Sequence, residues 1–436
     1  MKPPQKLRDL NKDEYEKIIK RSRAKIEEVL DEVIPIIRKV RKYGDEAVLN
    51  FTEKFDKVRL SCQDLVVGRE RVAEAYRRVP SNVLSSLKRM YKQVKNFHQY
   101  QLRQDWELTC SFAGKDKYRL GERFVPVQRA GVYVPGGKAV YPSTAIMAIV
   151  PAKVAGVEKV VVVSPPTRSG MMADAVIVAA DIAGADLMIN AGGVQAIAAL
   201  AYGTKSIPKV DIVVGPGNVY VTAAKTYLSS IGEIAIDCPA GPSEVLILAD
   251  DSANPAYVVS DMVAQAEHDE DACCMLLTTS EKLAQQVHRC LDIEVEQSLR
   301  KDIIRKSLES YGAILIADSL SEAVSFANEF APEHLEIMTS RPEDVLKKIK
   351  NAGSIFLGNF SPVAAGDYMS GTNHILPTGG SARGFSGLSV DTFLKRLTYQ
   401  FLSQKTLNSM NEDIANLSSV EGPYEAHMRS VRKRRE

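Results

Sequence analysis

A glutamate and a histidine stand side by side in the stretch NEFAPEHLEIMTS, residues 328–340. A helical pattern precedes this pair, and a predicted strand follows it. A histidine titrates near neutral pH and can act as a general base, and a neighbouring carboxylate can activate a water molecule. Glu333 and His334 are therefore candidates for proton-transfer chemistry. The alternative is that Glu333 caps a turn and His334 is an ordinary surface residue.

Further polar side chains that could bind a metal ion stand in three motifs, MVAQAEHDEDA, GNFSPVAAGDYMSGTNHILPTGG and EGPYEAHMRS. They are Gln265, His268, Asp367, His374, Glu421 and His427. The first two are three residues apart near the end of a predicted helix and so share one face. Imidazole, carboxylate and amide oxygens suit zinc or another first-row metal. The alternative for His268 is capping of its helix, and residues so far apart can bind one ion only if the fold brings them together.

Three glycine-bearing turns each follow a predicted strand and open a helix: YVPGGKAVYPS, NAGGVQAIAAL and VGPGNVYVTAAK. Glycine lets the backbone approach a ligand, and a helix N-terminus offers unpaired N–H groups to a phosphate. None of the turns fits G-x-G-x-x-G, and there is no Walker motif. An ordinary strand–helix connection would explain any one of them, but three in one domain favour a nucleotide or another anion.

The elements that must position these groups are short apolar strands alternating with helices. The strands are GVYV, KVVVVSPP, LMINAGG and DIVVGPG, then, after DCPAGPSEV, VLILAD, CMLLTTS, AILIAD, LEIMTS and SIFLG. Near-continuous apolar strands joined by helices are typical of a parallel sheet covered on both faces. The predicted fold class is α/β, with two tandem, incomplete Rossmann-like domains. Ligands are expected beyond the carboxyl ends of the strands.

Four segments are predicted along the chain. They are an N-terminal helical region packed on the α/β core (1–128), a first α/β domain (129–236), a second α/β domain (237–378) and a C-terminal tail without a sheet of its own (379–436). The charged amphipathic helices of residues 8–50 are expected to be scaffold and not site.

Composition excludes several function classes. The chain has 436 residues, 45% hydrophobic and 25% charged, and a net charge of +2, so it has room for two or more domains and no strong field for nucleic acid or a membrane surface. The basic tail RSVRKRRE suits a helix end. The sequence shows no secretory apolar segment and no run long enough to cross a bilayer, so a cytoplasmic location is expected, or an organelle.

The six cysteines form no metal or disulfide pattern and are expected to be reduced and mostly buried. Cys238 lies near the suspected site and could suggest covalent aldehyde chemistry, but a small buried cysteine needs no catalytic role.

Several unusual strings occur together in one order: AGPSEVLILAD, QAEH, FAPEHLEI, AGDYMSGTNHILPTGG and GLSVDTFLKR. Together they resemble the histidinol dehydrogenases, the zinc- and NAD-dependent enzymes of the last two steps of histidine synthesis. The strings YVPGG, GGVQAIAAL and GPGN also stand where that family contacts NAD. The resemblance runs from about residue 10 to the tail.

The resemblance implies a two-step, NAD-dependent oxidation of L-histidinol through L-histidinal to L-histidine, catalysed by Glu333 and His334. It implies NAD contacts from Tyr133, Gln195 and Asn218, all in the first α/β domain. It implies one zinc ion per subunit, bound in the second domain by Gln265, His268 and Asp367 and completed by His427 from the partner subunit of a homodimer. The substrate would contact Ser143, Ser243, Gln265, His268, His334, Asp367, His374, Glu421 and His427. The tail would form the dimer, although its E-G-P-Y-E-A-H is one residue longer than the family's E-G-x-x-A-H.

Roles for the adjacent pair follow from the chemistry of this reaction. Oxidation of an amino alcohol to an amino acid removes four electrons as two hydrides, and each hydride leaves as an O–H proton is withdrawn. His334 suits both proton abstractions, and Glu333 suits activation of the water that adds to the aldehyde between them. Zinc would position the substrate through its amine and imidazole nitrogens.

Other classes of protein remain as alternatives. A metal-dependent hydrolase or lyase would use the same polar residues but not three glycine turns, and a nucleic-acid-binding protein would rely on the basic tail alone. The closest alternative is a related zinc- and NAD-dependent dehydrogenase acting on another polar alcohol, such as a sulfonated diol. Glu421, His374 and the string LPTGGSARGFSGLSV favour the imidazole substrate. No nucleic-acid or membrane partner is predicted.

Overall fold

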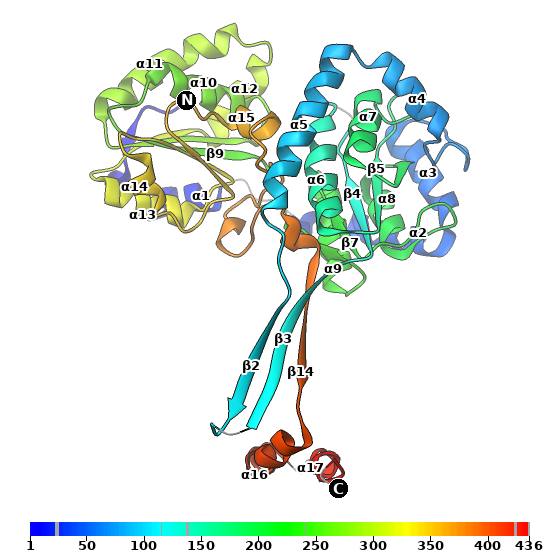
Figure 1. The fold of residues 1–436 in the computed structure, drawn as a ribbon. Coiled ribbons are helices and arrows are strands. Elements are labelled where there is room, and N and C mark those ends of the chain that lie inside the picture. Colours follow the sequence, from blue (N-terminus) through cyan, green and yellow to red (C-terminus); the bar gives the residue numbers. More distant parts are fainter. Residues whose placement is uncertain (22–25, 115, 137–138, 240, 423–424, 435–436) are drawn as a thin grey trace. The chain divides into compact units, whose positions relative to one another are not determined.

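The computed structural model describes residues 1–21, 26–114, 116–136, 139–239, 241–422 and 425–434. The chain forms two compact units (Figure 1). The first comprises residues 1–101 and 128–393, and the second comprises residues 102–127 and 394–436.

The first sheet of the first unit is parallel, with strand order β6-β5-β4-β7-β8. Its strands are β4 (Arg129–Tyr133), β5 (Lys159–Ser164), β6 (Leu187–Asn190), β7 (Ile212–Val214) and β8 (Ala235–Ile236). Its helices are α6 (Pro142–Ala155), α7 (Asp174–Ala183), α8 (Gly193–Tyr202) and α9 (Val219–Ser230). After β4, the chain adds β5 and β6 on one side of that strand. It then crosses over and adds β7 and β8 on the other side. This reversal is the kind of switch point at which α/β sheets bind ligands.

The second sheet is also parallel, with order β1-β11-β10-β9-β12-β13. Its strands are β1 (Gln5–Lys6), β9 (Glu244–Ala249), β10 (Cys273–Thr278), β11 (Ala313–Ile316), β12 (His334–Met338) and β13 (Ser354–Leu357). Its helices are α10 (Pro255–Ala266), α11 (Glu281–Gln297), α12 (Lys301–Tyr311), α13 (Leu320–Phe330), α14 (Pro342–Leu346) and α15 (Val363–Tyr368). Every residue of β9, β10 and β12 is buried, because helices cover both faces.

Helices of the N-terminal region pack against both sheets. They are α1 (Lys12–Lys20), α2 (Ile26–Tyr43), α3 (Asp45–Asp56), α4 (Arg69–Arg78) and α5 (Ser81–Gln99), preceded by a 3-10 turn, η1 (Leu7–Asp9). Apolar residues of α1 join the core of the second sheet, whereas those of α2 and α3 join the core of the first. A capping box between Asn11 and Glu14 fixes the start of α1.

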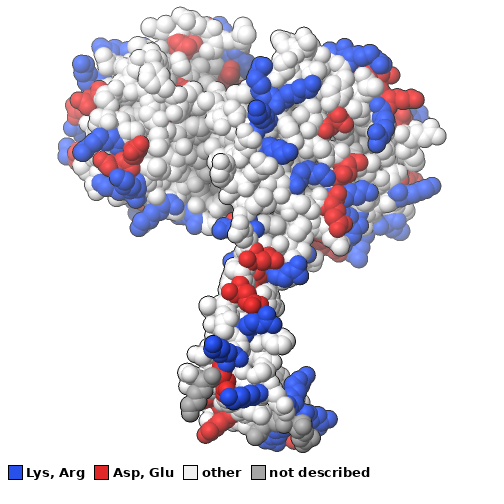
Figure 2. Space-filling model, in the orientation of Figure 1, with Lys and Arg blue, Asp and Glu red and all other residues white. Residues whose placement is uncertain are grey.

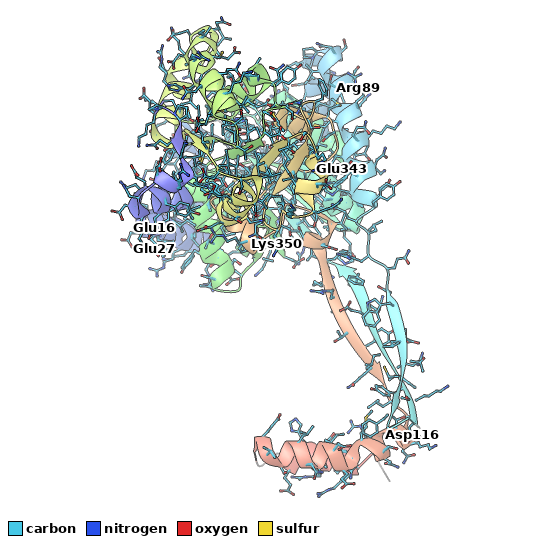
Figure 3. The ribbon with its side chains drawn as sticks, turned by 90° about the vertical axis from the view of Figure 1, so that its left-hand side faces the viewer. Glu16, Glu27, Arg89, Asp116, Glu343 and Lys350 are labelled. Atoms are coloured by element: carbon cyan, nitrogen blue, oxygen red, sulfur yellow. The ribbon has the colours of Figure 1, made fainter. Side chains whose placement is uncertain are left out.

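The second unit holds an antiparallel sheet of order β14-β3-β2. It contains β2 (Trp106–Phe112), β3 (Asp116–Pro126), β14 (Leu394–Phe401), α16 (Gln404–Glu421) and α17 (Glu425–Arg432). The start of α16 docks on β3, since Thr406 Oγ1 donates to the Lys117 carbonyl oxygen at 2.9 Å and Lys405 pairs with Asp116 at 3.0 Å (Figure 3 labels Asp116). These strands differ from the expectation of helices up to residue 128 and of a tail without a sheet.

The predicted fold class, two tandem α/β domains with parallel sheets, N-terminal helices and a helical C-terminal tail, is confirmed. The four segment boundaries remain a prediction. Two 3-10 turns, η2 (Ser381–Arg383) and η3 (Val390–Phe393), complete the first unit. None of the described helices is both long and apolar enough to cross a membrane. Figure 2 shows basic and acidic side chains interspersed over the face that it draws.

Candidate active site

The candidate NAD residues lie at the carboxyl edge of the first sheet, where sequence patterns predicted ligands. Tyr133 ends β4, and its hydroxyl oxygen accepts a hydrogen bond from the Gly193 N–H at 3.2 Å, which joins the turns after β4 and β6. Gly215, with φ +111°, follows β7, and a Cβ there would overlap the Tyr133 carbonyl oxygen. The three glycine-bearing turns therefore converge at the switch point between β4 and β7.

Gln195 and Asn218 lie on the two helices that open from these turns. Gln195 is on α8 and 1% exposed, and its buried Oε1 has no hydrogen-bond partner among the described residues. Asn218 caps α9 by accepting from the Val221 N–H at 3.1 Å. An orphaned amide oxygen beside helix N-termini and close-packed glycines fits a dinucleotide, whose hydroxyls can donate and whose phosphates can accept.

A buried ion pair holds the turn after β7. Lys225, on α9, donates from Nζ to the Gly215 carbonyl oxygen at 2.8 Å and to Asp237 at 2.5 Å. Asp237 in turn accepts from the Gly215 N–H at 2.8 Å, and both charged side chains are at most 4% exposed. Both backbone polar groups of Gly215 are thus fixed by charge-assisted bonds, which sets the shape of the turn that precedes Asn218.

Glu333 and His334 lie at the amino edge of the second sheet, because His334 is the first residue of β12. The expectation that ligand groups lie beyond the carboxyl ends of strands does not hold for this pair. A helix that follows a strand runs back past it, so the ends of α10 and α15 return to the amino edge with their polar residues. The sequence already places the pair before the predicted strand LEIMTS, but it does not show that α10 and α15 bring their polar residues back to this edge.

The hydrogen bonds of His334 fix its tautomer. Its Nδ1 lies 3.0 Å from the Glu244 carbonyl oxygen, and a carbonyl oxygen can only accept, so Nδ1 carries the proton. Nε2 then has a free lone pair, and it is buried without a hydrogen-bond partner among the described residues. Burial lowers the pKa of His334 to about 4, with Asp367 acting in the opposite direction. The imidazole is therefore neutral, and the lone pair of its Nε2 is free to accept a hydrogen bond or a proton.

Glu333 is held by a reciprocal pair of hydrogen bonds to Glu244. Glu333 Oε2 accepts from the Glu244 N–H at 2.8 Å, and the Glu333 N–H donates to Glu244 Oε1 at 3.1 Å. The same Oε2 lies 3.5 Å from His334 Nδ1. Burial raises the pKa of Glu333 well above its usual range, and the carboxylates of Glu244 and Asp367 add to this. Perturbed titration beside a free imidazole nitrogen is typical of a catalytic site.

The candidate metal ligands of the first unit come from α10 and α15. Gln265 is on α10, and its Nε2 is buried without a partner among the described residues. His268, two residues past the end of α10, donates from Nδ1 to the Gln265 carbonyl oxygen at 3.2 Å, leaving Nε2 for a ligand. Asp367 is on α15, and its charge and that of His268 both act on the pKa of His334. His268, Asp367 and His334 therefore lie close enough for their charges to interact.

This donor set fits a zinc ion in part. An amide oxygen, an imidazole and a carboxylate are suitable zinc ligands, whereas the unpartnered Nε2 of Gln265 is a hydrogen-bond donor that an acceptor on a bound substrate, and not a cation, would satisfy. Within the described ranges, however, no group of three or more His, Cys, Asp and Glu side chains is arranged to hold a metal. The ion would therefore need a further ligand beyond these three residues.

His374 extends the same cluster towards α6. Its Nδ1 donates to the Asp367 carbonyl oxygen at 3.1 Å, and its Nε2 lies 3.3 Å from the hydroxyl of Thr144. Ser143, beside Thr144, lines a cavity of about 460 Å³ together with Tyr368 and residues of α5, among them Arg89 (labelled in Figure 3). The cavity thus lies between α5, the start of α6 and the end of α15.

The remaining predicted substrate residues are Ser243, beside Glu244 at the amino edge of the second sheet, and Glu421 and His427 of the second unit. Ser243 precedes β9, and its carbonyl oxygen accepts from the Cys273 N–H at 3.0 Å. Glu421 ends α16 and His427 is on α17, so both belong to the second unit, where they are exposed. Burial raises the pKa of the Cys238 thiol to about 12, which makes it a poor nucleophile at neutral pH and argues against covalent aldehyde chemistry.

Sequence reasoning did not single out Glu244, which is hydrogen-bonded to Glu333 and His334, or Arg21, whose buried side chain pairs with Glu244. Glu244 stands inside the quoted motif AGPSEVLILAD, and the signal that could have drawn attention to it is a lone carboxylate opening an apolar strand. Arg21 lies among many charged residues of the N-terminal helices, and nothing in the surrounding sequence distinguishes it from them.

Known proteins resemble the whole chain. A family model described as histidinol dehydrogenase matches residues 19–435. A histidinol dehydrogenase of Methanocaldococcus jannaschii is 48% identical over 429 residues, covering 98% of this chain and 98% of that protein. One of Leptospira interrogans is 47% identical, covering 96% of each. The crystal structure of the histidinol dehydrogenase of Elizabethkingia anophelis has a TM-score of 0.91 at 36% identity, covering 98% of this chain and 96% of that one. The chain belongs to the histidinol dehydrogenase family.

Proposed function

We propose that this chain, a dehydrogenase by its family, oxidises L-histidinol through L-histidinal to L-histidine with NAD as the hydride acceptor. The observation that carries the proposal is the buried pair of Glu333 and His334. His334 offers one unpartnered nitrogen, and Glu333 is a neighbouring carboxyl held in a fixed orientation. A reaction with two proton abstractions and one water addition requires these two functions.

His334 acts as the general base in both oxidations. Its Nε2 takes the hydroxyl proton of the alcohol while a hydride leaves the same carbon, and it later takes a proton from the hydrated aldehyde in the same way. The lowered pKa of His334 keeps Nε2 unprotonated at neutral pH. The Nδ1 bond to the Glu244 carbonyl oxygen keeps the ring oriented through both steps.

Glu333 acts between the oxidations. It removes a proton from the water as the oxygen adds to the aldehyde carbon, while the proton that His334 took in the first oxidation passes to the former carbonyl oxygen; this yields the neutral hydrate and frees His334 for the second oxidation. Its two bonds to Glu244 orient the carboxyl group while the substrate changes shape.

Cofactor and subunit assignments are part of the same proposal. NAD is held by Tyr133, Gln195 and Asn218, and one zinc ion per subunit by Gln265, His268, Asp367 and His427 of the partner subunit. Bound zinc supplies a fixed anchor for the amine and imidazole nitrogens of the substrate. Ser143, Ser243, His374 and Glu421 complete the substrate contacts within a homodimer, and a cytoplasmic location remains a prediction.

A substrate comparison tests the proposal. Purified protein with zinc and NAD should reduce NAD with L-histidinol and should show no comparable activity with a sulfonated diol, the closest alternative substrate. Relatives that are histidinol dehydrogenases along the whole chain do not favour that alternative. Activity with the diol and none with L-histidinol would overturn the proposed substrate while leaving the family unchanged.

A further inference from the structure

Arg21 is a buried cation at the end of a helix expected to be scaffold. It caps α1, and its side chain is 2% exposed. Its Nε and Nη2 both donate to the carboxylate of Glu244, which is 1% exposed. Its Nη1 donates to the carbonyl oxygen of Phe330 at 2.8 Å, and the guanidinium stacks 3.6 Å from the centre of that ring. A two-pronged, stacked arrangement of this kind fixes both the position and the charge of its partner.

Glu244 connects this cation to both candidate catalytic residues. Its side chain accepts from the Glu333 N–H, and its backbone N–H donates to the Glu333 carboxyl group. Its carbonyl oxygen accepts from His334 Nδ1. Its Oε1 also accepts from the Gly379 N–H at 3.1 Å, which ties the loop after His374 to the same point. One residue, through its carboxylate and both of its backbone polar groups, thus contacts Glu333, His334 and Gly379 at the amino edge of the second sheet.

Removal of the guanidinium would leave this carboxylate buried without the cation that balances it. Such a group must bind a proton, admit water or move, because an unpaired charge in a buried site is very unfavourable. Each of these responses disturbs the oxygen that receives the Glu333 N–H. The two backbone groups of Glu244, its carbonyl oxygen on His334 and its N–H on the Glu333 carboxyl group, are less affected, since pairing of β9 with β10 and β12 holds the backbone. The loss therefore falls on the bond from the Glu333 N–H.

We propose that Arg21 is a positioning residue, which holds the Glu244 carboxylate in place and, through the bond that this carboxylate accepts from the Glu333 N–H, fixes the backbone that carries Glu333 for the water-addition step. The inference rests on the roles proposed for Glu333 and His334. It assigns the end of α1 to the active site, although Arg21 itself has no contact with the reacting atoms.

The test compares two half-reactions, oxidation of L-histidinol and oxidation of supplied L-histidinal. Arg21→Met removes the charge and keeps much of the volume. It should slow L-histidinal oxidation by about 10-fold or more, a part of the roughly 100-fold or greater contribution of a general base, and slow the first step distinctly less. Arg21→Lys keeps the charge but not the two-pronged geometry, so its rate of L-histidinal oxidation should lie between those of wild type and Arg21→Met.

A double variant separates positioning from simple loss of structure. In Arg21→Met/Glu244→Gln the amide oxygen can still accept from Glu333 and Gly379 but needs no cation. L-histidinal oxidation should therefore be faster than in either single variant, a non-additive result expected of residues in contact. The matched control is Arg8→Met, in the same N-terminal segment, whose exposed pair with Asp318 at 3.0 Å should be dispensable in both steps.

The outcomes distinguish this inference from the function on which it rests. If wild type does not oxidise L-histidinol, the proposed function fails and the inference fails with it. If wild type is active and Arg21→Met slows both half-reactions equally, or the double variant is no better than the singles, Arg21 has only a structural role. If Arg21→Met does not fold, the double variant compared with Glu244→Gln alone decides the question in the same way.

Discussion

Glu333 and His334 are neighbours in the chain, but their hydrogen bonds differ, and so should the effects of replacing them. Glu333→Gln keeps the shape of the side chain and removes the group that activates water. It should spare oxidation of L-histidinol to the aldehyde and slow oxidation of L-histidinal by about 100-fold or more. His334→Asn removes the base needed twice and should slow both half-reactions. Single-turnover measurements of NADH formation from each substrate would separate the steps.

Equal losses in both half-reactions for Glu333→Gln would contradict this division of roles. They would mean that Glu333 acts only by holding His334, whose Nδ1 lies 3.5 Å from the Glu333 carboxyl group.

At the residue scale, the sequence could identify the groups that do chemistry but not the groups that hold them. Glu333, His334 and the metal-ligand candidates stand in short strings with unusual composition. Arg21 and Glu244 are 223 residues apart, and their pairing depends on how α1 packs beside β9. No local pattern reports such a contact, because both residues have ordinary helical or strand neighbours.

The ion pair between Lys225 and Asp237 gives a prediction about one element, the turn after β7. Lys225→Met leaves Asp237 buried and unpaired, so the free energy of unfolding should fall by about 3–5 kcal/mol, the usual cost of breaking a buried pair. The KM for NAD should rise, because the turn loses a bond at Gly215. Lys225→Met/Asp237→Asn should recover part of the stability. Urea unfolding and NAD titrations would measure both effects.

The control for this variant is Lys209→Met in the same domain. Lys209 pairs with Glu233 at 3.1 Å but is 45% exposed, so its loss should change the free energy of unfolding by about 0.5 kcal/mol or less. Equal effects of the two lysine variants would show that the buried pair does not hold the turn.

The buried His98 predicts a pH dependence of stability at helix α5. Its Nδ1 donates to Gln101 Oε1 at 2.7 Å, and its Nε2 accepts from Asn373 Nδ2 at 3.2 Å, so the folded ring is neutral. Burial lowers its pKa, whereas the unfolded ring binds a proton below about pH 6.5. The unfolded state therefore binds more protons as the pH falls, and the contribution of His98 to stability, complete above about pH 6.5, is lost below it.

His98→Gln should flatten this dependence. The loss of unfolding free energy between about pH 7 and about pH 5 should be smaller in the variant than in wild type, since contributions from other groups are common to both. Urea unfolding at a series of pH values measures the difference. If the unfolding free energy depends on pH equally in wild type and variant, His98 takes up a proton equally in the folded and unfolded states.

Strands that are buried on both faces could be predicted from the sequence, whereas exposed strands could not. The strands of both parallel sheets appear as apolar runs because helices cover them, whereas β14 is almost wholly exposed and alternates too weakly to be recognised. The two residues of β1 are too few to form a pattern. The sequence places Glu333 just before its strand, but which other residues gather at that amino edge depends on how the helices and strands pack, which periodicity does not report.

At the scale of the whole molecule, the proposed homodimer predicts complementation between inactive variants. His427→Asn and His268→Asn should each be nearly inactive and bind zinc poorly. If His427 acts in the partner's site, a mixed dimer has one site with both lesions and one with neither. Co-refolding of the two variants should then restore about a quarter of wild-type activity, since about half of the dimers are mixed and each has one intact site.

The same mixture decides where the ligand comes from. With both ligands from one chain, every site would carry one lesion, and mixing would restore nothing. Differently tagged variants would show by two-step affinity purification that mixed dimers formed, so that a lack of recovery in that fraction counts against the shared site.

The stoichiometry of the reaction tests the central claim, that one site carries an alcohol through an aldehyde to an acid. Purified protein, supplied with zinc, excess NAD and a limiting known amount of L-histidinol, should form two NADH for each L-histidinol consumed. L-histidine should accumulate as the product, without free L-histidinal. One NADH for each L-histidinol, with the aldehyde released into solution, would contradict the roles of Glu333 and His334 in a single site.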